Sequence, residues 1–337
     1  MDDQLLSVWQ RKGEVRIKSF DDFMENVDAF MKPREEPKLE VNRFLFRGTA
    51  NVNWKLVPSL PRSVGPDLEK PDRPWLTREL LYHIETESTA QFRSKAHLYL
   101  DSKFIPEPNN YLAWWQLMQH HHAKTRMLDW TASPFVAAYF AVAESPTNDG
   151  AIWMVDHGAH YGRMAERYPD GTGRAKVMLY TGVQKIPIPG DPEPIIVVQI
   201  LQESEKRTEN LFDQRAKDDL DCLYFCPCVV RNQRMNAQSG WFSWAALIEA
   251  DHGEAIARAF SHKPEHSDRW WCQRLVIDHD AKPEILRKLW HMNQTGETLY
   301  CGLDGLGRAM SELTDLLTPD HCKYQLEHGV LSVTKRH

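Results

Sequence analysis

The sequence has no run of apolar residues near the length of about 20 that a membrane-spanning helix requires. Its first 15 residues are polar and lack the apolar core of a secretory signal peptide. No internal repeat is visible. These absences predict a cytoplasmic protein with no membrane partner.

Cysteine is scarce, and basic residues do not outnumber acidic ones. Six cysteines in a long chain without a secretory signal are expected to be reduced thiols. Three of them, Cys222, Cys226 and Cys228, lack the paired spacing of zinc ligands, so we expect buried thiols and no metal. Lys plus Arg is 41 and Asp plus Glu is 47, a net charge of −6 that argues against a bulk electrostatic DNA binder.

What the sequence does have is the composition of a folded protein. Its 337 residues are 42% hydrophobic and 26% charged, which predicts one large domain or two ordinary ones with a real core. Strand-like and helix-like segments are mixed without regular alternation, which is typical of the α+β class. Expected helices lie at 20–30, 76–100, from 110, 134–142, 283–292 and 303–317, and expected strands at 151–155, 195–200, 241–248 and 275–277.

Positive charge is concentrated in three segments of this acidic chain. Residues 42–62, 119–133 and 229–244 carry +4, +1 and +2, which is +7 together. If the segments converge, they form a basic cleft suited to an anion such as pyrophosphate or nucleic acid. The alternative is that their arginines are solvated or paired. Nearby tryptophans could stack bases, although most are expected in the core: Trp114, Trp115, Trp241 and Trp244.

Four motif blocks follow one another along the chain. The first is Phe-Arg-Gly at 46–48 with Trp-Lys-Leu-Val-Pro-Ser-Leu-Pro-Arg at 54–62. The second, at 119–134, begins Gln-His-His and ends Asp-Trp-Thr-Ala-Ser-Pro. The third is Arg-Met-Asn-Ala-Gln-Ser-Gly-Trp-Phe at 234–242, and the fourth combines Thr-Leu-Tyr at 298–300 with Leu-Asp-Gly-Leu at 303–306. In this order the blocks resemble the FRG domain family, which often has Gly-Leu-Pro where this chain has His-Ala-Lys at 122–124.

This resemblance implies a division of the chain and a fold. It places an N-terminal extension at 1–42, an FRG domain at 43–318 and a C-terminal tail at 319–337. The FRG pattern is in turn similar to ADP-ribosyltransferases of the Arg-Ser-Glu type. That similarity implies an ADP-ribosyltransferase-like split β-sheet core with surrounding helices.

The same resemblance implies an activity. It predicts an enzyme that uses NAD as substrate, acting as a toxin or antiphage defence effector that modifies nucleic acid, RNA or DNA. An antitoxin protein is an expected partner. Two alternatives stay open, an NAD glycohydrolase with water as acceptor and an inactive module that binds an anion or nucleic acid. A metal-dependent nuclease is disfavoured because Asp129 is the only acid in the three basic segments.

The resemblance also suggests residues for NAD binding. Arg47 takes the place of the arginine that grips the pyrophosphate, a task that suits a planar guanidinium. The hydroxyl of Thr131 or Ser133 suits the nicotinamide ribose, although Ser133 before Pro134 is equally typical of a helix N-cap. The full set of candidates is Arg47, Gly48, Thr49, Arg126, Thr131 and Ser133.

The catalytic candidates are Arg47, His121, Asp129 and Gln238. Gln238 stands at the place of the usual Glu and cannot ionise, so Asp129 or Glu249 could supply the missing carboxylate. His120 or His121 could deprotonate an acceptor, because imidazole titrates near neutral pH. The ordinary alternatives are an ion pair of Arg47 with Asp129, and a structural turn at Gln238.

Overall fold

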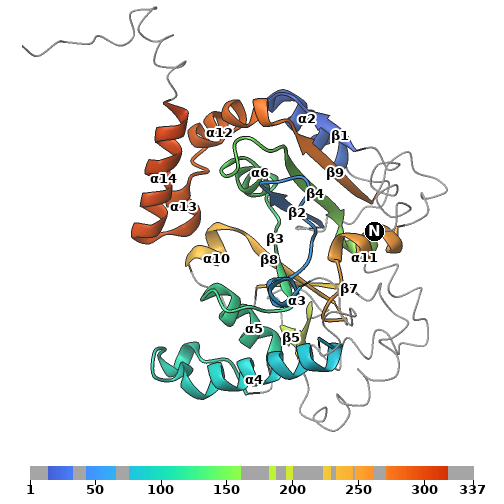
Figure 1. Cartoon of the computed structure of the whole chain (residues 1–337), viewed down its shortest axis with the longest axis vertical. Coiled ribbons are helices and arrows are strands. Elements are labelled where there is room, and N and C mark those ends of the chain that lie inside the picture. The colour runs from blue at the N-terminus through green and yellow to red at the C-terminus, as the bar shows by residue number, and fades with distance from the viewer. Residues whose placement is uncertain are drawn as a thin grey trace, which may run out of the picture.

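The computed structural model describes residues 14–32, 43–65, 76–108, 110–160, 182–186, 195–199, 223–228, 233–245, 247–260 and 271–317. These ranges form a seven-stranded mixed sheet, a separate two-stranded hairpin and surrounding helices (Figure 1). The predicted α+β class is confirmed. No helix within these ranges has the length and apolar character needed to cross a membrane.

The sheet is built from β1 (Val15–Ile17), β2 (Phe44–Thr49), β3 (Met127–Thr131), β4 (Gly150–Asp156), β7 (Leu223–Pro227), β8 (Gly240–Ala245) and β9 (Cys272–Ile277). Its strand order is β1-β9-β4-β2-β3-β8-β7, and β5 (Gly182–Ile186) and β6 (Ile195–Gln199) form the hairpin. The strands expected at 151–155, 195–200 and 275–277 are confirmed. The one expected at 241–248 ends earlier, at residue 245.

The longer helices are α2 (Phe20–Met31), α4 (Arg78–Ala96), α5 (Tyr111–His120), α6 (Pro134–Val142), α11 (His252–Ala259), α12 (Lys282–His291) and α14 (Gly302–Leu316). Shorter ones are α3 (Ser59–Val64), α10 (Gln233–Ala237) and α13 (Gly296–Tyr300). All the helices expected from the sequence are present. Their starts follow the capping residues: Thr77, Asn110 and Ser133 each accept a hydrogen bond from the first turn of the helix that follows.

The N-terminal part of the chain belongs to this fold. β1 pairs in parallel with β9, with Val15 opposite Leu275. Along α2 the buried residues recur at helical spacing and join the core that α6 and α12 also line: Phe20, Phe23, Val27 and Phe30. The predicted extension at 1–42 therefore supplies a strand and a helix to the domain. Its residues 1–13 and 33–42, like the predicted tail at 319–337, lie outside the described residues.

The central sheet is only weakly joined between β2 and β3. These strands share one paired position, Phe46 opposite Thr131, whereas β2 pairs with β4 from Phe44–Asp156 through Thr49–Ala151. On β2, α6 packs so closely that a Cβ added to Gly48 would lie 1.9 Å from the Ala137 carbonyl oxygen. Arg47, next to this glycine, therefore sits on a strand that is fixed by α6 and β4 but largely unpaired toward β3.

Candidate functional site

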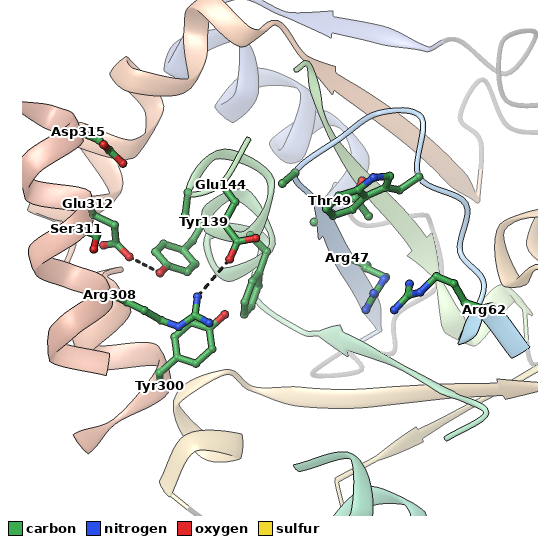
Figure 2. A pocket seen from close by; sticks show the side chains of 15 residues that line it. Arg47, Thr49, Arg62, Tyr139, Glu144, Tyr300, Arg308, Ser311, Glu312 and Asp315 are labelled. Atoms are coloured by element: carbon green, nitrogen blue, oxygen red, sulfur yellow. Dashed lines mark hydrogen bonds and ion pairs between the residues drawn. The ribbon is translucent and has the colours of Figure 1, made fainter. Parts of the chain in front are cut away.

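Two adjoining pockets lie beside β2 and α6. Lobe 1, about 430 Å³, is lined by Arg47, Gly48, Thr49, Ala50, Trp54, Arg62, Tyr139, Phe140, Ala143, Glu144, Tyr300, Arg308, Ser311, Glu312 and Asp315 (Figure 2). Lobe 2, about 280 Å³, is lined by Phe46, Arg47, Gly48, Gln119, His120, His122, Asp129, Trp130, Thr131, Val136, Phe140, Arg234, Met235, Gln238 and Tyr300. Because they share Arg47, Gly48, Phe140 and Tyr300, they are two parts of one cleft.

Arg47 lies where the two lobes meet. Its Nη1 donates a hydrogen bond to the main-chain carbonyl of Asp129, while its Nε is buried and has no partner among the described residues. Burial lowers the pKa of Arg47, the charge of Asp129 raises it, and the neighbouring Arg62 lowers it further. The expected alternative, an ion pair with the Asp129 carboxylate, is not what holds Arg47. Arg47 is half-buried, and a guanidinium whose buried Nε has an unused donor is the kind of group that an anion would stabilise.

All three segments reach the cleft, but only the first and the third bring arginines to it, because Lys124 and Arg126 of the second line neither lobe, so the predicted convergence of positive charge holds only in part. Arg47 and Arg62 come from the first, Asp129 from the second and Arg234 from the third. The cleft is nevertheless mixed in charge, because acids from α6 and α14 line lobe 1: Glu144, Glu312 and Asp315. Other basic side chains of the first segment are neutralised elsewhere, Arg43 by Asp156 at 3.0 Å and Lys55 by Glu254 at 3.8 Å.

Hydrogen bonds join the second, third and fourth motif blocks beside lobe 2. The Thr131 hydroxyl donates to the main-chain carbonyl of Gln238 at 2.7 Å and accepts from the Ser133 amide at 3.0 Å. The Gln238 side chain donates from Nε2 to the Leu299 carbonyl at 3.0 Å. Since that carbonyl can only accept, the orientation of the amide is fixed. Gln238 can therefore offer its Oε1 acceptor to a ligand in lobe 2.

A family model described as the FRG domain matches residues 42–150. Residues 42–150 are thus similar to FRG domains. The match covers less than half of the chain and contains β2, Arg47, Asp129 and Thr131, whereas Arg234 and Gln238 lie beyond it. No curated protein and no solved structure matched the chain.

Of the histidines in the second motif block, His121 is the catalytic candidate from the sequence, with His120 as its alternative. His120 and His122 line lobe 2, whereas His121 is exposed and lines neither lobe, because it lies on another side of the helix end. Burial, with help from His121 and Arg234, lowers the pKa of His120 to about 4, so its imidazole is neutral at pH 7. His122 has φ 64°, the left-handed region that favours glycine. This chain therefore forms a left-handed turn at His122, the position where the FRG family often has glycine.

Arg126 is a structural residue, which corrects its place among the NAD-binding candidates. Its side chain is 2% exposed, and its Nε donates to both carboxylate oxygens of Glu85, at 2.7 and 3.0 Å. The guanidinium also lies over the rings of Tyr82 and Trp115, 5.1 Å from each centroid. Arg126 lines neither lobe and instead ties α4 to the start of β3.

Two further candidates have structural partners. Ser133 caps α6 by accepting a hydrogen bond from the Val136 amide at 3.3 Å, and it lines neither lobe. Glu249 accepts a hydrogen bond from Arg78 Nε at 2.7 Å and also lies outside the cleft. Asp129 does line lobe 2, and its carboxylate makes no hydrogen bond or ion pair with the described residues. Of the two carboxylates proposed from the sequence, only Asp129 lines the cleft.

Gly48 and Thr49 line the cleft but also serve the fold. Gly48 lines both lobes, and its lack of a side chain is required by the contact with α6. Thr49 lines lobe 1 and donates a weak hydrogen bond to the Ala151 carbonyl at 3.4 Å. Gly48 and Thr49 therefore line the cleft mainly as parts of the fold. Of the three consecutive residues of β2 from Arg47 to Thr49, Arg47 is the one with an unused hydrogen-bond donor among the described residues.

Several site residues carried no assignable signal in the sequence. The guanidiniums of Arg234 and Arg308 each lie over the ring of Tyr300, at 4.8 and 4.2 Å from its centroid. Glu312 is buried, accepting from the Tyr139 hydroxyl and from the Gly296 amide at 3.1 Å. Burial and Glu312 raise the pKa of Tyr139. Tyr139, Arg308 and Glu312 lie outside the quoted motif blocks, and nothing in the block that contains Tyr300 indicates which side chains it contacts.

The cysteine cluster shows no metal-binding geometry where it can be seen. Burial raises the pKa of the Cys226 thiol to about 12. Across the described ranges no group of His, Cys, Asp and Glu residues could hold a metal ion. Cys222 and Cys322 lie outside those ranges.

Proposed function

We propose that the cleft binds NAD and transfers its ADP-ribose group to an acceptor. The observation that carries this proposal is the meeting of the FRG motif blocks around Arg47, whose buried Nε has no partner among the described residues. The weak junction between β2 and β3 supports it, because the resemblance to Arg-Ser-Glu ADP-ribosyltransferases implies a split sheet whose first strand ends in the arginine.

The reaction breaks the bond between the nicotinamide nitrogen and C1 of the ribose. Nicotinamide leaves as a neutral molecule, and positive charge builds on the sugar until the acceptor nucleophile bonds to C1. In this proposal Arg47 holds the pyrophosphate through its free donors. Gln238 accepts a hydrogen bond from a ribose hydroxyl through Oε1.

Asp129 supplies the negative charge that Gln238 cannot. Its carboxylate lines lobe 2, and its main-chain carbonyl is hydrogen-bonded to Arg47, which fixes the phosphate grip and the carboxylate relative to each other. A carboxylate there stabilises the positive sugar in the transition state and takes the proton that the acceptor loses. His120, neutral at pH 7, can accept a hydrogen bond in the same lobe.

The acceptor that we propose is a nucleic acid. Trp54 is 51% exposed at the edge of lobe 1, which Arg62 and Arg308 also line. Exposed aromatic rings beside arginines bind single-stranded nucleic acid by stacking and by phosphate contacts. The acids of lobe 1 limit this attraction, so the acceptor class must be tested against protein and water.

The test uses NAD labelled in its adenylate phosphate, incubated with purified protein and with cellular RNA, DNA or protein. We expect label on one nucleic-acid class and its loss in Asp129→Asn. The matched control Asp280→Asn removes a carboxylate that is 91% exposed outside the cleft and should leave transfer unchanged. Free ADP-ribose without labelled macromolecule would show a glycohydrolase instead. A folded protein that consumes no NAD with any acceptor would contradict the proposal.

A further inference from the structure

The two arginines of lobe 1 that lie on the β2 side form a pair. Figure 2 shows the guanidiniums of Arg47 and Arg62 pointing toward one another at the wall of lobe 1, away from Arg308 and the acids of α14. Arg47 comes from the Phe-Arg-Gly motif, and Arg62 ends the Pro-Ser-Leu-Pro-Arg stretch of the same block. Arg62 is not among the site residues expected from the sequence.

The backbone that carries Arg62 is held firmly against the start of β3. The amide of Leu60 donates to the Thr125 carbonyl at 3.1 Å, and the Thr125 amide donates to the Ser59 hydroxyl at 3.1 Å. Leu60 and Pro61 are buried, while Arg62 is exposed. Arg62 is thus an exposed cation on a fixed turn of helix rather than on an unsupported loop.

Neither guanidinium has a carboxylate partner among the described residues. Arg47 is bound only to the Asp129 main-chain carbonyl, and Arg62 donates from Nη1 to the Val57 carbonyl at 3.3 Å. The two like charges oppose each other, since Arg62 lowers the pKa of Arg47 in addition to the effect of burial. A bound anion between them would remove this repulsion and use the buried Nε of Arg47.

We propose that Arg47 and Arg62 together form a clamp for a pyrophosphate group, with Arg62 as a substrate-binding residue. Two guanidiniums match the two negative charges of a pyrophosphate diester, and each planar fork can bind phosphate oxygens through two hydrogen bonds. That the pyrophosphate belongs to NAD rests on the proposed function. The clamp itself does not, because it is argued from the two arginines alone.

Calorimetric titration with ADP-ribose and with inorganic pyrophosphate tests the clamp. Arg62→Gln should weaken ADP-ribose binding by about 10- to 100-fold, the usual effect of losing hydrogen bonds to a charged group. Arg62→Lys keeps the charge but loses the two-pronged geometry, so it should bind with intermediate affinity. Lys288→Gln removes an exposed charge on α12 and should change affinity less than twofold. Because Arg62 is exposed, its variants should melt at the wild-type temperature.

The outcomes separate the clamp from the proposed reaction. Equal binding of ADP-ribose by wild type and Arg62→Gln would overturn the clamp and leave ADP-ribosyl transfer standing. Arg62-dependent pyrophosphate binding by a protein that never consumes NAD would support the clamp and refute the reaction. If Arg62→Gln weakened binding of a single-stranded oligonucleotide but not of ADP-ribose, Arg62 would belong to the acceptor site and the clamp would be wrong. Wild-type protein that binds neither pyrophosphate nor ADP-ribose would also overturn it.

Discussion

Gly48→Ala should destabilise the protein severely even though the added group is a single methyl. The new Cβ would lie 1.9 Å from the Ala137 carbonyl oxygen and 2.8 Å from the Ala141 amide nitrogen. Both are main-chain atoms of α6, so no side chain can rotate away, and either α6 or β2 must shift. Overpacking of a core typically lowers the free energy of unfolding by about 1–3 kcal/mol, and a clash with helix main chain belongs at or above the upper value.

Thermal unfolding followed by circular dichroism measures this effect. A loss of about 3 kcal/mol corresponds to a fall in Tm of roughly 4–5 °C for a domain of this size. The matched control is Gly307→Ala on α14, where an added Cβ meets nothing within 4 Å. It should raise stability by up to about 1 kcal/mol, because alanine favours the helix. A Gly48→Ala protein that melts within about 2 °C of wild type would refute the packing that places Arg47.

Three other changes probe separate parts of the structure. Arg126→Met should lower the free energy of unfolding by about 3–5 kcal/mol in urea, because it leaves Glu85 buried without its partner; a loss under about 1 kcal/mol would contradict the buried pair. Gln238→Glu should lower nicotinamide release, because a carboxylate oxygen would replace the Nε2 atom that donates a hydrogen bond to the Leu299 carbonyl. Increased release would contradict this and would show that the site lacks only a carboxylate. Burial lowers the pKa of His252 to about 3, so the unfolded chain takes up the proton first and stability should fall as pH drops from about 6.5 toward 3. His252→Gln should flatten the dependence of Tm on pH over that window, and an unchanged slope would argue against a neutral buried imidazole.

Local elements were predictable because their signals are local. Ser133 followed by Pro134 marks the start of α6, and the apolar residues after it predict a buried helix, as found. The strands at 151–155 and 275–277 are short apolar runs bounded by turn residues, and both are present. Convergence of the basic segments could also be anticipated, because an ordered set of motif blocks implied one site.

Which side chain faces the cleft could not be read from the motifs. Arg47 and Arg126 both lie in motif blocks, but only the fold shows that Arg126 is paired with Glu85 and so does not reach the cleft. One residue of helical rotation decides that His120 rather than His121 lines lobe 2. Contacts between distant parts of the chain carried no local signal at all, as for Glu312 with the Tyr139 hydroxyl and for the pairing of β1 with β9.

The central claim is that Arg47 binds NAD for ADP-ribosyl transfer. The most direct measurement is nicotinamide release from NAD by wild-type protein and by Arg47→Ala, with and without RNA, DNA and protein as acceptors. The account predicts release by wild type that depends on one acceptor class, and a loss of release in Arg47→Ala while Lys288→Gln stays active. Full activity in Arg47→Ala, or no release by folded wild-type protein with any acceptor, would contradict it.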